Sequence, residues 1–430
     1  MKLKRLPDDF RVEELADFAP GGSGDFALYR LVKRGIGSLE AIDAVCRRWK
    51  IARQRLACCG LKDRHAQTSQ FVSIQRGPRR GLRQTNLELD YLGQIDRAVV
   101  PGDIRGNRFQ IVVRSLTDRD VAAACAALDH VVRDGLPNYF DDQRFGSVGE
   151  SGEFIGQAWI RGDWQRTLWL ALAEPNPLDR SRDRDEKRVL REHWGDWAAC
   201  KAKLFSKKGT GVFCRNGPEG AVHKRLPSPF SQRCQVVAHL AERADDFRGA
   251  LTRIGADERS LYLAAFQSHL WNRLLAAYIE RLVPASQLAS VRLKLGDVPF
   301  FTALDATQRA ALVGMELPLP SARMHLEDGP VKEFVDRTLA ELGLAMREIR
   351  VKYPRDSFFS KGWRPAVFRV AALAYQAGAD ELYADRAKLS VQFDLPRGSY
   401  ATILIKRVTI AAGRDDGPAT ADSDAPHENE

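Results

Sequence analysis

Two patterns of hydrophobic and polar residues occur in the first 135 positions of the chain. Short segments rich in β-branched and aromatic side chains predict strands at 9–15, 26–35, 70–75, 87–95 and 108–116. Residues 38–50 and 118–135 instead repeat apolar side chains three and four positions apart, which predicts two amphipathic helices. This mixture, with antiparallel pairs expected among the strands, indicates an α+β fold.

From about residue 137 the pattern becomes helical. The charge-dense stretch 176–209 has few strand-forming residues, and 258–283 and 330–344 repeat apolar residues at helical spacing. Residues 388–410 then return to β-branched residues on both sides of a Pro-Arg-Gly turn, which predicts a pair of strands. A split domain that carries an insertion explains this order better than three separate domains.

We therefore expect a first domain made of residues 1–136 and 366–410, interrupted by a mostly helical domain of residues 137–365. A chain of 430 residues exceeds what one hydrophobic core usually supports, in agreement with two domains. Residues 411–430 are polar and acidic and contain no aromatic residue, so this tail is expected to be disordered.

The composition is that of a soluble globular protein. No run of about 18 apolar residues is present, so no membrane-spanning segment is predicted. The N-terminus becomes acidic at Asp8 and Asp9 and lacks the apolar core of a signal peptide, which makes the cytoplasm the expected location. The seven cysteines include no CxxC pair, and the adjacent Cys58 and Cys59 do not have zinc-site spacing. We expect free thiols and no bound metal.

The charge of the chain indicates a class of binding partner. The net charge is +10, but the tail 411–430 carries −5, so residues 1–410 carry +15. A basic body of this size points to a polyanion, with nucleic acid as the first candidate. The alternative is that the charge serves solubility alone.

Asp63 lies in the stretch CCGLKDRHAQTSQFVSIQ (58–75), between the cations Lys62 and Arg64. Gly60 permits a tight approach, and the strand that follows would anchor the loop. The flanking cations are expected to hold the carboxylate ionised, ready to act as a general base or a nucleophile. The alternative is an ordinary surface ion pair in a turn, and spacing alone does not decide between the two.

Two neighbouring stretches suit RNA. RGPRRGLR (76–83) gathers four arginines, which fit phosphate contacts or, alternatively, a solvated loop. GNRFQIVVR (106–114) places Asn107 and Phe109 two positions apart, on one face of an extended segment. An amide can bind the edge of a base and an aromatic ring can stack on its face. The alternative for Phe109 is a simple core residue.

Six motifs together carry a family resemblance. In chain order they are DFRVEE (9–14), GLKDRHAQTSQ (60–70), GNRFQIVVR (106–114), PNYFDDQRFGS (137–147), LAAFQSHLWNRLL (263–275) and LPRGSYATILIKR (395–407). The set resembles the tRNA pseudouridine synthase D (TruD) family from residue 4 to about 407. No single motif is decisive, but six in the same order are highly specific.

The resemblance implies a pseudouridine synthase catalytic domain around a bent antiparallel sheet, interrupted by a mostly helical TRUD insertion domain. It implies isomerisation of a uridine in tRNA, typically at position 13, with relatives that act on other RNAs. No cofactor is expected, because nothing is oxidised and no group is transferred. The expected partner is tRNA, and a monomer is expected.

The resemblance also assigns roles to residues. It makes Asp63 the catalytic carboxylate, which would attack C1′ or remove a proton from C2′; the sequence does not choose between these. The uridine-binding residues that it implies are Phe10, Asn107, Phe109 and Tyr400. Support for the carboxylate is implied for Lys4 and Lys62.

The chain departs from the family in three places. Tyr400 stands where Phe is frequent, Asp141 stands where Gly is usual, and the charged stretch 176–225 is longer than in compact bacterial members. Two other classes of protein remain open. A non-catalytic RNA-binding protein would share the basic body and the aromatic residues, whereas a metal-dependent nuclease would need clustered carboxylates and histidines, which the sequence does not show.

Overall fold

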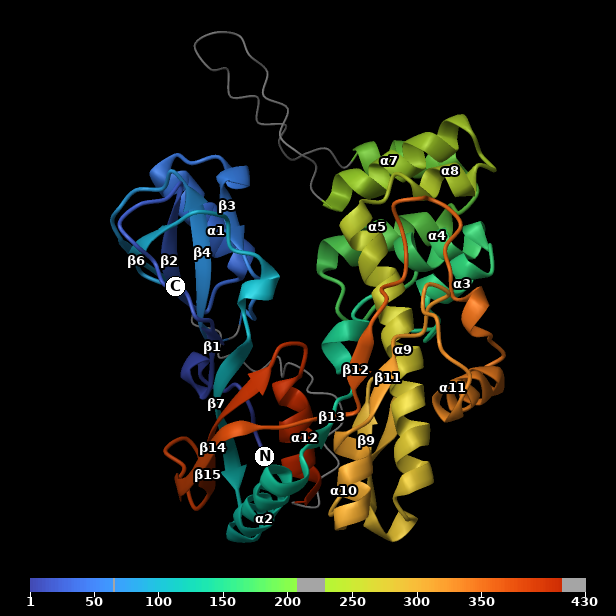
Figure 1. Ribbon diagram of the computed structural model, residues 1–430. Helices are drawn as coiled ribbons and strands as arrows, with labels where there is room; N and C mark the ends of the chain where they lie inside the picture. Colours follow the sequence, from blue (N-terminus) through green and yellow to red (C-terminus); the bar gives the residue numbers. More distant parts are fainter. Residues whose placement is uncertain (65, 207–228, 412–430) are drawn as a thin grey trace.

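The computed structural model describes residues 1–64, 66–206 and 229–411. The chain forms two lobes side by side, one built on a large sheet and one mostly helical (Figure 1). Except for residue 411, the tail predicted to be disordered lies outside the described residues, as does part of the charged stretch 176–225.

The sheet lobe is built on nine strands in the order β14-β15-β7-β1-β4-β2-β6-β5, with β3 paired to β4. Their bounds are β1 (Phe10–Leu15), β2 (Phe26–Arg34), β3 (Leu56–Cys58), β4 (Gln67–Gln75), β5 (Leu82–Gln84), β6 (Leu87–Ile95), β7 (Gly106–Leu116), β14 (Ala371–Ala379) and β15 (Ala387–Pro396). All of these strand pairs are antiparallel except β1 with β4, where Val12 lies opposite Thr68. The α+β class is confirmed, and the parallel pair is an addition to the prediction.

Strand β7 joins the two ends of the chain. Ile111 of β7 lies opposite Phe10 on one side and opposite Val391 of β15 on the other. Close to the expected domain boundaries, the short strands β8 (Leu136–Pro137) and β13 (Val367–Phe368) pair with each other. The first and last strands thus share one sheet, while the boundaries at 136 and 366 stay a prediction.

Three helices accompany the sheet: α1 (Ser38–Trp49), α2 (Asp118–Asp134) and α12 (Ala401–Ala411). The buried stripe Ala41, Ile42 and Val45 of α1 packs in one core cluster with Tyr29 and Val72 of the sheet. Helix α2 begins at the cap Thr117, whose hydroxyl accepts a hydrogen bond from the Asp120 amide.

Helix α12 corrects one expectation. Residues 388–410 were predicted to form two strands, but only the first half does so, as β15. The buried residues Ala401, Leu404, Ile405 and Val408 recur three and four positions apart and lie in the main core. Packing of this stripe outweighs the strand preference of the β-branched side chains.

The second lobe is mostly helical, as predicted. Its helices are α3 (Ile155–Ile160), α4 (Trp164–Leu172), α5 (Ser181–Glu192), α6 (Trp197–Ser206), α7 (Pro229–Glu242), α8 (Phe247–Leu251), α9 (Ala256–Leu282), α10 (Ala306–Val313) and α11 (Pro330–Glu341). Two small antiparallel sheets pair β9 (Leu288–Leu293) with β10 (Gly296–Phe301), and β11 (Glu316–Pro318) with β12 (Trp363–Pro365). The long helix α9 runs along this lobe (Figure 1) and buries Phe266 and Trp271 in its core.

Candidate active site

Asp63 lies in the loop between β3 and β4, and polar side chains fix the backbone of this loop. The amide of Lys62 donates to the hydroxyl of Ser38, at 2.8 Å, and the side-chain amide of Gln70 donates to the Gly60 carbonyl, at 3.1 Å. Ser38 in turn donates to the Gln70 side-chain oxygen. The loop is therefore held against the start of α1 and the strand β4.

Two side chains from distant parts of the chain bond the Asp63 carboxylate. Lys4 Nζ lies 3.0 Å from Oδ2, and Gln143 Nε2 donates to Oδ1 at 3.4 Å. The carboxylate remains 36% exposed, so a substrate can reach it. Gln143 belongs to the short 3₁₀ helix η4 (Asp142–Phe145), which follows the motif segment PNYF.

The cations next to Asp63 in sequence have other partners, which corrects the prediction made from spacing. Lys62 Nζ pairs with Glu14, at 2.9 Å, and Arg64 pairs with Glu40, at 3.4 Å. Among the described residues, Lys4 is the cation in contact with the Asp63 carboxylate. Lys4 thus contacts the carboxylate directly and Lys62 does not, while the supporting role implied for each stays a prediction.

Lys4 reaches Asp63 from an unusual backbone conformation. Its φ is +52°, in the left-handed region, and its ammonium also lies 4.3 Å from the centre of the Phe10 ring. A non-glycine residue there costs about 1 kcal/mol or more, and such residues concentrate at functional sites. The neighbouring residue Lys2 is bridged to Arg114 of β7, which fixes this segment on the sheet.

Lys33 supports the Asp63 loop from beneath. Its side chain is buried and donates to the carbonyl oxygens of Asp63, at 2.6 Å, and Ile36, at 2.8 Å. Burial lowers the pKa of the Lys33 ammonium to about 8, with Lys62 acting in the same direction and Asp63 opposing it. Nothing in the sequence marked this lysine as part of the site.

Lys62 links Asn107 to a buried carboxylate. Its ammonium donates to Asn107 Oδ1, at 3.1 Å, and pairs with Glu14, whose other oxygen accepts from the Phe71 amide, at 2.8 Å. Glu14 and Asn107 lie opposite each other on β1 and β7. The hydrogen bond from Lys62 to the Asn107 oxygen thus orients the amide.

Phe10 and Phe109 lie together beside these groups. Their ring centres are 6.3 Å apart in an edge-to-face arrangement, and Phe109 also stacks on Phe393, at 5.5 Å. Phe10 is only 7% exposed and Phe109 only 9% exposed. Most of each ring is therefore core, as the alternative for Phe109 held, and little of either side chain is open to a base.

Tyr400 contacts the site indirectly. It lies between β15 and α12, and its ring meets Phe140 edge to face, with centres 6.3 Å apart. Phe140 precedes the turn η4 that carries Gln143, the partner of Asp63. A role for Tyr400 in stacking on the uridine stays a prediction.

The same turn explains the departure at Asp141. Its φ of −93° and ψ of 174° are ordinary extended values, so a glycine is not required. Its buried carboxylate accepts from Lys406, at 2.6 Å, and from the Thr402 hydroxyl, both on α12. Asp141 therefore ties the turn of Gln143 to the C-terminal helix.

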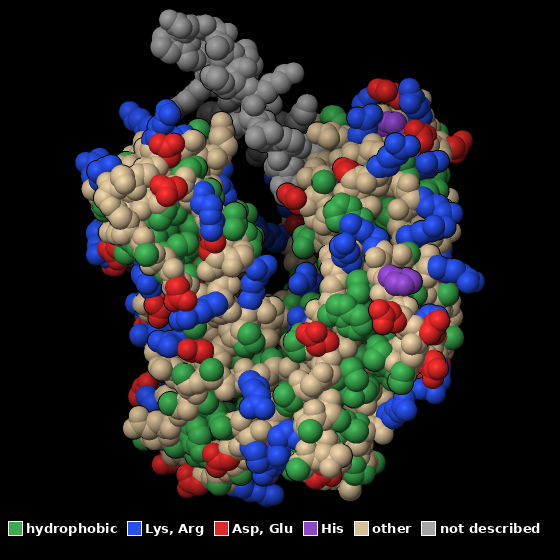
Figure 2. Space-filling model, in the orientation of Figure 1, with side chains coloured by type: hydrophobic (Ala, Val, Ile, Leu, Met, Phe, Trp, Pro, Cys, Tyr) green, Lys and Arg blue, Asp and Glu red, His purple; other side chains and the backbone are tan. Residues whose placement is uncertain are grey.

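The two lobes face each other across a cleft in which lysine and arginine side chains gather (Figure 2). The arginine-rich stretch 76–83 begins at the end of β4 that is remote from Asp63 and runs back to β5, where Arg83 lies opposite Glu88 of β6. Arg76 is therefore separated from the Asp63 end of β4 by the length of a nine-residue strand, roughly 30 Å at about 3.3 Å per residue. Arg83 is also paired with Glu88 and Asp90, whereas Arg79 and Arg80 are exposed.

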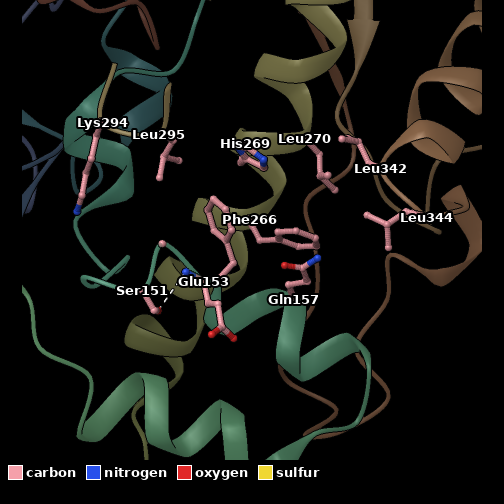
Figure 3. Close-up of a pocket in the computed structure, with 12 residues that line it drawn as sticks. Ser151, Glu153, Gln157, Phe266, His269, Leu270, Lys294, Leu295, Leu342 and Leu344 are labelled. Atoms are coloured by element: carbon pink, nitrogen blue, oxygen red, sulfur yellow. Dashed lines mark hydrogen bonds between the residues drawn. The ribbon is translucent and has the colours of Figure 1, made fainter. Parts of the chain in front are cut away.

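A cavity of about 510 Å³ lies in the helical lobe, between α3, α9 and the segment after α11 (Figure 3). Phe154, Phe266 and His269 line it, and burial lowers the pKa of His269 to about 4. Lys294 at its edge donates to the carbonyls of Phe145, the last residue of η4, and of Val148. None of the residues that the sequence assigned to the site lines this cavity.

Within residues 1–64, 66–206 and 229–411, no helix is long and apolar enough to cross a membrane. Over the same residues, no group of three or more His, Cys, Asp or Glu side chains is arranged to hold a metal ion. The described cysteines are free thiols.

Comparison with known proteins gives consistent matches over nearly the whole chain. The family model for "tRNA pseudouridine synthase D (TruD)" matches residues 1–209 and 206–408. The "Probable tRNA pseudouridine synthase D 2" of Methanocaldococcus jannaschii is 30% identical over 411 residues, which are 95% of this chain and 92% of that protein. The "tRNA pseudouridine synthase D" of Aquifex aeolicus is 26% identical over 414 residues, 95% of this chain and 98% of that protein.

A solved structure shares the fold. The crystal structure of the "Putative tRNA pseudouridine synthase D (TruD)" from Methanosarcina mazei matches with a TM-score of 0.68 at 22% sequence identity. The match covers 95% of this chain and 93% of that chain.

Proposed function

Because the chain belongs to the tRNA pseudouridine synthase D family, we propose that it uses Asp63 to isomerise a specific uridine of tRNA, at position 13, without a cofactor. The observation that carries this proposal is the exposed Asp63 carboxylate, held by Lys4 and Gln143 from two remote segments. An ordinary surface ion pair would not need a buried lysine beneath its loop or a left-handed residue beside it. We further infer a monomer that acts in the cytoplasm.

The reaction breaks the C1′–N1 bond of uridine and forms a C1′–C5 bond. Asp63 either attacks C1′ to form a covalent intermediate or removes the C2′ proton to give a glycal. In both cases the C5 hydrogen leaves and N1 gains a proton, so the product is an isomer of the substrate. Lys4 and Gln143 each bond one carboxylate oxygen and so orient the group toward the sugar.

The detached uracil must turn over without leaving the site. The amino group of Asn107 is a donor and therefore suits a carbonyl oxygen of the base, while Lys62 keeps the amide in this orientation. The ring of Tyr400 offers a face for stacking, which is worth about 1–3 kcal/mol per base. Phe10 and Phe109, packed edge to face, form the floor of the proposed uridine site.

The target uridine must leave its stack in the tRNA, at a cost of a few kcal/mol. The basic cleft between the lobes supplies phosphate contacts that offset this cost (Figure 2). The total charge of +10 includes −5 on the tail, so residues 1–410 carry +15. This positive charge also favours binding to the RNA phosphates.

The proposal is tested by mapping pseudouridine, by carbodiimide modification, in RNA from cells with and without this gene. We expect one tRNA signal, at position 13, to disappear without the gene and to return with the wild-type chain but not with Asp63→Asn. Loss of the signal in a different RNA would instead assign that RNA as the substrate. Restoration by Asp63→Asn would instead favour a non-catalytic RNA-binding protein.

A further inference from the structure

Two arginines lie against one aromatic ring beside the proposed catalytic loop. The guanidinium carbon of Arg364 is 4.1 Å from the centre of the Phe140 ring, and that of Arg144 is 5.4 Å from the same centre. Arg364 also lies 5.0 Å from the Trp271 ring centre. The rings place both positive groups in a partly apolar environment, where a guanidinium stacks well on an aromatic face.

Neither arginine is paired with a carboxylate within the described part of the chain. Arg364 donates to neutral oxygens, the main-chain and side-chain oxygens of Asn138, at 2.8 and 2.6 Å, and the Gly398 carbonyl, at 3.0 Å. Arg144 Nε is buried and has no hydrogen-bond partner among the described residues. By contrast, the buried Arg114 and Arg259 each bond carboxylates.

Both positive groups thus lie against the Phe140 ring without a carboxylate partner among the described residues. Burial lowers the pKa of Arg364 to about 10; Tyr400 opposes this effect and the positive charge of Arg144 adds to it. A charge without a partner in such surroundings is costly, so an anion that reaches these groups gains both hydrogen bonds and compensation of charge.

Both groups adjoin the proposed reaction centre. Arg144 follows Gln143, whose amide bonds the Asp63 carboxylate. Arg364 bonds Gly398, two residues before Tyr400. Arg144 thus lies on the turn that holds Asp63, and Arg364, on β12, contacts the segment that leads to Tyr400.

We propose that Arg144 and Arg364 bind a phosphate of the RNA backbone next to the target uridine. This inference rests on the proposed function, since it requires RNA at Asp63. A phosphodiester matches the planar donor fork of a guanidinium, and neither of these two guanidinium groups is paired with a carboxylate among the described residues. The contact would hold the nucleotide that carries the flipped base, while Asp63 and Asn107 act on its sugar and its base.

The first test measures RNA affinity against salt, in an Asp63→Asn background so that the RNA is not converted. Arg144→Gln removes the charge and keeps most of the side-chain volume, whereas Arg144→Lys keeps the charge but loses the fork. We expect Arg144→Gln to lower affinity about tenfold at low salt and to flatten the log–log slope by about 0.7–0.9, the contribution of one phosphate. Arg144→Lys should keep the slope and lose less affinity.

The control is Arg119→Gln, at an exposed position on α2. It should leave both affinity and slope unchanged. Thermal melting of each variant shows whether the fold is kept; if Arg144→Gln does not fold, Arg144→Lys carries the second test. A slope for Arg144→Gln equal to that of the control would overturn the inference.

The second test locates the phosphate. Neutral methylphosphonate linkages are placed one at a time on either side of the target uridine in a tRNA fragment. One linkage should weaken binding about tenfold with the parent protein and hardly at all with Arg144→Gln. If the affinity loss caused by Arg144→Gln and the loss caused by the linkage add up at either position, the assignment is refuted. If the wild-type chain isomerises no tRNA, the proposed function fails and this inference fails with it, whereas turnover with an unchanged slope refutes this inference alone.

Discussion

Replacement of Lys33 by methionine should have opposite effects on turnover and on stability. Methionine keeps the length and apolar stem of the side chain but removes the ammonium that bonds the carbonyls of Asp63 and Ile36. Without this anchor the Asp63 peptide can shift, and a displacement of about 1 Å can cost on the order of 10²-fold in rate. The fold, however, loses a buried charge that it had to accommodate.

The magnitude follows from the pKa of Lys33, which burial lowers from 10.5 to about 8 in the folded chain. This difference corresponds to about 3 kcal/mol, at 1.36 kcal/mol per pKa unit. Between pH 8 and 10.5 the unfolded chain binds more protons at this position than the folded chain, so stability rises with pH. From pH 7.5 to pH 9.5 the gain from Lys33 is about 2 kcal/mol, and Lys33→Met should lack it.

The assay is urea unfolding, followed by far-UV circular dichroism, at both pH values for the wild type and Lys33→Met. The wild type should gain about 2 kcal/mol more than the variant over this interval. Lys50→Met, at an exposed position after α1, is the control and should behave as wild type. Equal pH dependence of wild type and Lys33→Met would refute the account of Lys33 as a buried, charged support.

Further substitutions test the way the base is held. Lys62→Met leaves the Asn107 amide free to rotate and the buried Glu14 without its partner. We expect kcat/KM on tRNA to fall about 10- to 100-fold and the free energy of unfolding to fall by about 3 kcal/mol. A kcat/KM within twofold of wild type would contradict the proposed role of Lys62 in orienting Asn107. Tyr400→Phe should cost little and Tyr400→Ala much more in single-turnover rate, because stacking needs only the ring; equal losses would assign the role to the hydroxyl instead.

Local patterns predicted most elements of the sheet lobe and the long helix α9. The strands β2, β6 and β7 were visible from their β-branched and aromatic residues. The helices α1, α2 and α9 were visible from apolar residues at helical spacing, because each helix buries a face of its own. Helix α12 was misread since its β-branched residues suggested strands. Its buried positions 401, 404, 405 and 408 follow helical spacing, which was the signal available in the sequence.

The site was harder to predict, because its contacts join distant segments. Lys4 and Gln143 lie 59 and 80 positions from Asp63 in sequence, and no periodicity relates them to it. Lys62 was placed beside the carboxylate by sequence proximity, but its side chain reaches Glu14 and Asn107 instead. Gln143 and Glu14 belong to two of the six family motifs, whereas no motif or spacing marks Lys33.

The central claim is that the Asp63 carboxylate performs the chemistry, and it is tested by Asp63→Asn on tRNA that carries tritium at C5 of its uridines. Bond formation at C5 releases the tritium to water, so its release counts turnovers directly. The account predicts that release by Asp63→Asn falls to background, while tRNA affinity stays within about threefold of wild type because phosphate contacts carry the binding. Release within tenfold of the wild-type rate would contradict the assignment of Asp63.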